Sequence, residues 1–142
     1  AYIPAMIWEK VWEHLSTMLH ELKMGGTENF ENFINAVIDR KAFDKIKSYI
    51  DYAKSQSEAS IIWGGNCDSN KGYFIEPTVI KTTNPNFKTM VEEIFGPVLT
   101  VYVYEVSVQK MAQILDQTSD YALTGSIFSQ DKQILAELTD IL

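Results

Sequence analysis

The residues with the clearest chemical potential in this sequence lie together in one short segment, Glu92 to Val98 (EEIFGPV). A carboxylate such as that of Glu93 can accept hydrogen bonds from both hydroxyls of a vicinal diol, as found in a ribose. An aromatic ring such as Phe95 can pack against a sugar or a nicotinamide ring, and Gly96 permits a close backbone approach. The alternative is that the two acids form a solvated helix end leading into a strand, because adjacent acids are usually exposed.

Other familiar catalytic and metal-binding patterns are missing from the sequence. His14 and His20 fall on one predicted helix, where about 100° per residue turns their side chains about 120° apart, so they cannot form a metal pair. The single cysteine, Cys67, lies in a polar loop without the helix start or basic neighbour that would lower its pKa. There is no glycine-rich phosphate loop. We therefore predict no catalytic residue and no metal ligand in this chain.

Composition narrows the range of partners. The formal net charge is -7, and such a surface repels phosphate backbones, so we predict no nucleic-acid partner. No apolar run approaches the length needed to cross a bilayer, which predicts no membrane partner. A single thiol suits a reducing compartment such as the cytosol or the mitochondrial matrix.

The first part of the chain is predicted to be helical. Apolar spacing indicates a helix from Pro4 to about Lys23, with inward positions at Ile7, Val11, Leu15, Met18 and Leu22. Trp8 and Trp12 widen this stripe, either as core residues or as the contact face for another protein. Residues 27–38 look irregular, with one helical turn near Phe33. Asp39 is a predicted N-cap for a second helix, whose inward residues are Phe43, Ile46, Ile50 and Ala53.

Helices and strands then mostly alternate, which predicts an α/β fold with a largely parallel sheet and helices against it. Pro77 confines the extended segment 72–80 to a sheet edge or a strand end. The predicted elements are a buried strand at 60–63, a short helix at 88–93, strands at 99–104 and 123–128, and helices capped by Ser107 and Asp131.

Three motifs give the chain a resemblance to the aldehyde dehydrogenase family. Glu92 to Val98 resembles a signature of that family, Gly72 to Thr78 (GYFIEPT) resembles its upstream segment, and Tyr121 to Ser129 (YALTGSIFS) resembles its downstream segment. The resemblance covers the whole chain. It implies that residues 1–142 form part of a three-layer, parallel-sheet catalytic domain, without a complete cofactor-binding domain.

The resemblance also implies roles for residues. Glu93 and Phe95 take the positions that hold the nicotinamide ribose of NAD, whereas Glu76 and Pro77 are expected to shape a turn. Short cues resemble the glutamate-semialdehyde (pyrroline-5-carboxylate) subgroup: residues 36–39, 101–104 and 128–131. That subgroup implies NAD-dependent oxidation of glutamate semialdehyde to glutamate in proline breakdown. It also implies a homo-oligomer in the mitochondrial matrix, with the cytoplasm as the alternative.

The chain departs from the family pattern in its downstream motif and at the catalytic cysteine. Ala122 stands where the family usually has glycine, and the family's nucleophilic cysteine would precede Ala1. We expect the chain alone to be inactive. We also expect both ends to be cuts through a larger fold, because the chain opens on a strand-like triplet before Pro4 and stops on the apolar Ile141-Leu142 without a glycine stop. The alternative function is a non-catalytic, truncated interaction module that binds another protein.

Overall fold

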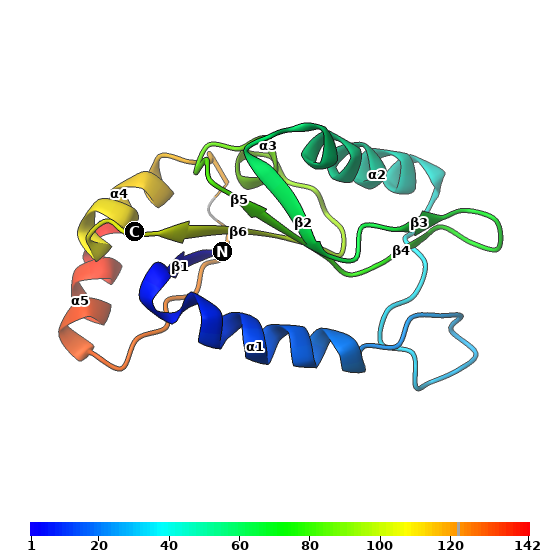
Figure 1. The fold of residues 1–142 in the computed structure, drawn as a ribbon, viewed down its shortest axis with the longest axis horizontal. Helices are drawn as coiled ribbons and strands as arrows, with labels where there is room; N and C mark the ends of the chain where they lie inside the picture. Colours follow the sequence, from blue (N-terminus) through cyan, green and yellow to red (C-terminus); the bar gives the residue numbers. More distant parts are fainter. Residues whose placement is uncertain (122) are drawn as a thin grey trace.

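The computed structural model describes residues 1–121 and 123–142 as a sheet with helices on both faces (Figure 1). In chain order the elements are β1 (Tyr2–Pro4), α1 (Ala5–Glu21), α2 (Arg40–Ser55), β2 (Ala59–Trp63), β3 (Cys67–Asp68), β4 (Phe74–Ile75), β5 (Thr78–Thr82), α3 (Lys88–Val91), β6 (Val98–Tyr104), α4 (Val108–Asp116) and α5 (Lys132–Ile141). The main sheet has the order β1-β6-β5-β2, and β3 and β4 form a separate two-stranded ladder. The predicted α/β architecture is confirmed.

The sheet is largely parallel, as the alternation of elements predicted. β6 pairs in parallel with both β1 and β5, whereas β2 runs antiparallel to β5. The strand predicted at 60–63 is formed as β2, but it lies at the sheet edge and is only half-buried, so the prediction that this strand is buried is wrong. Pro77 immediately precedes β5, which lies inside the sheet. The strand-end alternative for this proline is therefore correct, because a proline at that point removes no donor from the ladder.

Helix α1 covers one face of the sheet, below it in Figure 1. Trp8 is 6% exposed and packs with Val79 and Val101, while Trp12 stacks on Trp8 at a centroid distance of 5.7 Å. These tryptophans therefore belong to the core rather than to a contact face. Within the predicted inward stripe, Ile7 and Met18 are exposed. The helix is rotated because the two large indoles, which bury the most apolar area, face the sheet.

Helix α2 covers the opposite face of the sheet and begins where the sequence predicts. The Asp39 side chain accepts a hydrogen bond of 2.7 Å from the backbone N–H of Ala42. Alternation along β5 directs Val79 toward α1, whereas Ile80 packs on the α2 side. All four residues predicted to face inward from α2 are buried: Phe43, Ile46, Ile50 and Ala53.

The last part of the chain departs from prediction between its two helices. Ser107 and Asp131 cap α4 and α5 as expected, and these helices contact each other. The predicted strand at 123–128 is wrong, since Leu123 to Phe128 forms no strand and these two end residues are 97% and 93% exposed. Alternating apolar residues give a strand only where a neighbouring strand accepts their backbone. The substitution at Ala122 lies outside the described residues.

The irregular segment after α1 contains one further correction. The helical turn predicted near Phe33 is reduced to one isolated turn just before it, in which the Asn32 N–H donates to the Asn29 carbonyl at 3.0 Å; the Phe33 side chain lies outside that turn and is 75% exposed. Instead, the neighbouring Ile34 makes an isolated parallel bridge with Met24. Pairing with the chain that leaves α1 satisfies backbone groups that a helical turn would otherwise have used.

Candidate functional site

The segment singled out from the sequence is a loop that joins α3 to β6, here called the 92–97 loop. Its inward residue is Ile94, which is 8% exposed and packs into a cluster with Phe43, Ile46 and Ile75. Glu93 and Phe95, on either side of Ile94, are exposed. The loop therefore uses one apolar side chain as an anchor and presents the two predicted cofactor-contacting residues to solvent.

The backbone of Phe95 adopts an uncommon conformation. Its φ is +61°, which makes it the one non-glycine residue with positive φ among the residues that the structure describes. This left-handed conformation costs about 1–2 kcal/mol for a residue with a Cβ. Neighbouring bonds hold it in place: the Val98 N–H donates to the Gly96 carbonyl at 2.8 Å, and the Thr78 N–H donates to the Pro97 carbonyl at 2.9 Å. Such strain persists where the surroundings over-determine the backbone, commonly at functional sites.

Gly96 permits the loop to approach α2. A Cβ at this position would lie 2.5 Å from Cδ1 and 2.9 Å from Cγ1 of Ile46. The Ile46 side chain is 1% exposed and has little room to move. Gly96 therefore allows the loop to pack against the Ile46 side chain, while its predicted role in admitting a ligand close to the backbone stays a prediction.

The two adjacent acids of the loop have different surroundings. Tyr49, on α2, donates its hydroxyl to Glu92 Oε2 at 2.6 Å, and this hydrogen bond to a carboxylate raises the pKa of Tyr49 to about 12. The Glu93 carboxylate accepts no hydrogen bond and pairs with no cation within residues 1–121 and 123–142. Its backbone carbonyl accepts a bond of 3.0 Å from Lys45 Nζ. Only Glu93 therefore keeps its full acceptor capacity for a ligand.

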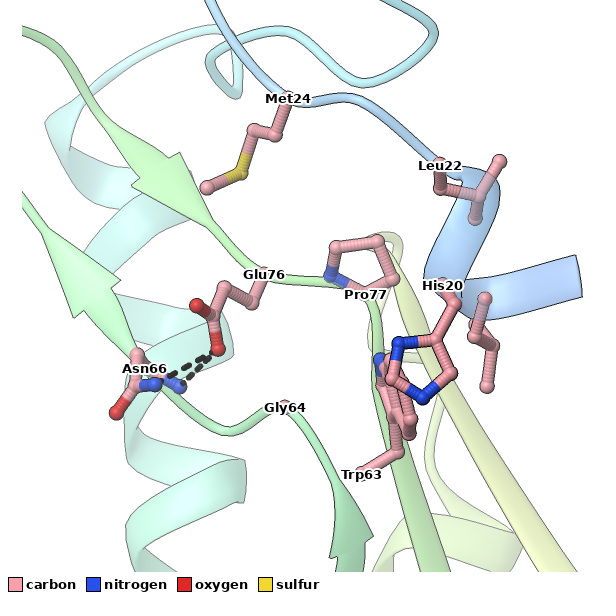
Figure 2. Close-up of a pocket in the computed structure, with 9 residues that line it drawn as sticks. His20, Leu22, Met24, Trp63, Gly64, Asn66, Glu76 and Pro77 are labelled. Atoms are coloured by element: carbon pink, nitrogen blue, oxygen red, sulfur yellow. Dashed lines mark hydrogen bonds between the residues drawn. The ribbon is translucent and has the colours of Figure 1, made fainter. Parts of the chain in front are cut away.

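A pocket lies elsewhere, between the end of α1 and the start of the β2–β3 connection (Figure 2). Its volume is about 420 Å³, and neither Glu93 nor Phe95 lines it. The structure thus does not bring the predicted cofactor residues into this pocket. The lining residues are Leu19, His20, Leu22, Met24, Trp63, Gly64, Asn66, Glu76 and Pro77.

Two side-chain pairs shape this pocket. The side-chain amide and the backbone N–H of Asn66 both donate to Glu76 Oε2, at 2.8 and 3.4 Å (Figure 2). The backbone N–H of Glu76 in turn donates to the Asn66 carbonyl at 3.0 Å. These bonds agree with the turn-shaping role expected for Glu76. His20 meets Trp63 edge to face, with ring centroids 4.5 Å apart. Sequence reasoning missed this contact, since nothing in the local pattern links the end of α1 to β2.

The remaining candidates for chemistry have ordinary structural surroundings. Cys67 lies in β3, where burial raises the pKa of its thiol and so disfavours the reactive thiolate. The described residues contain no group of three or more His, Cys, Asp or Glu side chains placed to hold a metal ion. None of the described helices is both long enough and apolar enough to cross a membrane.

Comparison with known proteins identifies the family. The model of the aldehyde dehydrogenase family matches residues 1–141, and the chain belongs to this family. A mitochondrial delta-1-pyrroline-5-carboxylate dehydrogenase from Dictyostelium discoideum is 52% identical over 130 residues, covering 91% of this chain and 23% of that protein. The enzyme of the same name from Danio rerio is 49% identical over 138 residues, covering 96% of this chain and 25% of that protein.

Solved structures of the family have the same fold. The Mycobacterium tuberculosis delta-pyrroline-5-carboxylate dehydrogenase bound with NAD superposes with a TM-score of 0.89 at 32% identity, covering 99% of this chain and 25% of that one. Betaine aldehyde dehydrogenase from Staphylococcus aureus in complex with NAD⁺ gives a TM-score of 0.88 at 30% identity, covering 99% and 28%. This chain therefore spans about a quarter of the length of the relatives it matches.

Proposed function

We propose that this chain works as part of the catalytic domain of a longer, NAD-dependent aldehyde dehydrogenase, and that Glu93 and Phe95 contact the nicotinamide end of NAD. The observation that carries this proposal is the Glu93 carboxylate, exposed and without a partner among the described residues. It projects from a loop whose backbone is fixed on both sides by hydrogen bonds and by burial of Ile94.

The residues present fit the cofactor. A free carboxylate offers acceptors for both hydroxyls of a ribose, and the exposed Phe95 ring offers a flat apolar face beside it. When bound, NAD supplies the acceptor for the hydride that leaves the aldehyde carbon. The part of this chain is to orient the nicotinamide ribose through Glu93 and to limit the position of the ring through Phe95. Orientation of this kind accounts for a large share of many rate enhancements.

The proposed substrate is the aldehyde of glutamate semialdehyde, oxidised to glutamate in the mitochondrial matrix. The support is that the curated relatives described above are named mitochondrial delta-1-pyrroline-5-carboxylate dehydrogenases and match nearly the whole chain. A competing role as an interaction module loses its main support, because Trp8 is buried in the core.

The test is Glu93→Gln in the full-length protein that carries this segment. The amide retains one acceptor oxygen but loses the charge, so we expect aldehyde turnover to fall roughly tenfold or more, as for the loss of one charged hydrogen bond. Steady-state kinetics and calorimetric titration with NAD give the readout. The matched control is Glu105→Gln, which changes another exposed acid, outside the loop. Unchanged turnover in Glu93→Gln would show that Glu93 is only a solvated acid.

A further inference from the structure

Two side chains of α2 reach the 92–97 loop from the same side. Lys45 and Tyr49 are one helical turn apart and therefore share a face of α2. Tyr49 donates to the Glu92 carboxylate at 2.6 Å, and Lys45 donates to the Glu93 carbonyl at 3.0 Å. Consecutive residues of the loop are thus bonded to consecutive turns of one helix.

The Tyr49 ring is itself held firmly. It is 7% exposed and belongs to the core cluster that also receives Ile94. The Lys88 ammonium of α3 lies over the ring, 5.1 Å from its centroid, within range of a cation–π contact. The hydroxyl is therefore presented to Glu92 by a ring with little freedom to reorient.

Glu92 links this contact to the end of α3. It is the C-cap residue of α3, and its backbone N–H donates to the Lys88 carbonyl at 3.0 Å. A four-residue helix is too short to be stable without tertiary contacts. The bond from Tyr49 thus fixes the point at which the chain leaves α3 and enters the segment that carries Glu93 and Phe95.

We propose that Tyr49, through Glu92 and assisted by Lys45, is a positioning residue that sets where Glu93 and Phe95 meet the nicotinamide end of NAD. This inference rests on the proposed function of those two residues. Tyr49 does not touch the cofactor; its effect is transmitted by the backbone between Glu92 and Glu93. Removing its hydroxyl leaves the ring packed and frees the loop to move away from α2.

The kinetic test compares Tyr49→Phe with Tyr52→Phe in the full-length protein. Tyr52 is the neighbouring tyrosine of α2; its ring packs on Phe87, and its hydroxyl makes no hydrogen bond among the described residues. Loss of one hydrogen bond to a charged group corresponds to roughly a tenfold effect. We expect KM for NAD to rise by roughly that factor in Tyr49→Phe, with KM for the aldehyde unchanged and Tyr52→Phe like wild type. A fall in kcat alone, with both KM values unchanged, would mark a merely structural role and overturn the proposal.

A second measurement separates this inference from the proposed function. Backbone ¹⁵N order parameters of Glu93 and Phe95 are measured in the 142-residue chain without NAD, for wild type, Tyr49→Phe and Tyr52→Phe. We expect lower order parameters at both positions in Tyr49→Phe only. Suppose that Glu93→Gln leaves turnover unchanged but Tyr49→Phe still lowers the order parameters of Glu93 and Phe95. In that case the proposed contact of Glu93 with NAD is wrong, whereas the inference that Tyr49 holds the 92–97 loop is supported. Equal order parameters of Glu93 and Phe95 in all three proteins would overturn the inference that the Tyr49 hydroxyl holds the 92–97 loop in place.

Discussion

At the scale of single residues, Phe95 combines two unfavourable properties. Its side chain is 85% exposed, so burial contributes little, and its backbone occupies the left-handed region that favours glycine. A residue selected only for stability at this position would be glycine or asparagine. The phenyl ring is retained at a cost to folding, which is the pattern expected where a side chain serves a ligand.

Replacing Phe95 tests whether its left-handed backbone conformation lowers the stability of the chain. Phe95→Gly should raise the free energy of unfolding by about 0.5–1 kcal/mol, because relief of backbone strain exceeds the added flexibility of glycine. Phe95→Ala removes the same ring but keeps a Cβ, so its stability should stay close to that of wild type. Urea denaturation of the 142-residue chain distinguishes the two. Equal stability of both variants would contradict the assignment of strain at this position.

At the scale of elements, local signals were sufficient at the helix caps and for the inward face of α2, whereas the inward stripe predicted for α1 was rotated, with Ile7 and Met18 exposed. The Asp39, Ser107 and Asp131 caps and the inward face of α2 were all predictable from spacing. The signals failed where burial depended on distant partners, as for residues 123–128, which carry a strand pattern but form no strand. The motif around Glu93 and Phe95 could be located from sequence, whereas the Tyr49–Glu92 bond could not, because it joins residues 43 positions apart.

The packing between the 92–97 loop and α2 gives a prediction at this scale. Gly96→Ala should destabilise the chain by about 1–3 kcal/mol, because its Cβ would overpack the buried Ile46 side chain. Gly125→Ala is the matched control, since a Cβ there meets nothing within 4 Å. Thermal unfolding of both variants gives the comparison. If Gly96→Ala unfolds at the wild-type temperature, α2 does not constrain the loop as described.

At the scale of the whole molecule, the stable part is the sheet sandwiched between α1 and α2. Both faces of β5 and β6 are covered, as shown by Val79 and Val101 toward α1 and Ile80 toward α2. The α4–α5 pair is packed less deeply, and α5 has no buried residue. The 92–97 loop belongs to the stable part, because it is bonded to α2 and enters β6 directly.

Hydrogen exchange should reveal this division. Amides of β5 and β6 should exchange only on global unfolding, whereas those of residues 124–128 should exchange at rates close to those of an unfolded chain, since that segment forms no ladder. Mass spectrometry of peptides from the 142-residue chain resolves the two regions. Strong protection at 124–128 would mean that the segment pairs with a strand in solution.

The parallel pairing of β1 with β6 also affects the order in which the protein can assemble during its synthesis. Tyr2 pairs with Tyr102, so the first strand lacks its neighbour until about 100 further residues have been made. At ribosomal speeds this delay is roughly 5–20 seconds. Through that interval Val101 of β6 is missing from the cluster in which Trp8 is buried. The core cluster around Trp8 is therefore completed only after β6 has been synthesised.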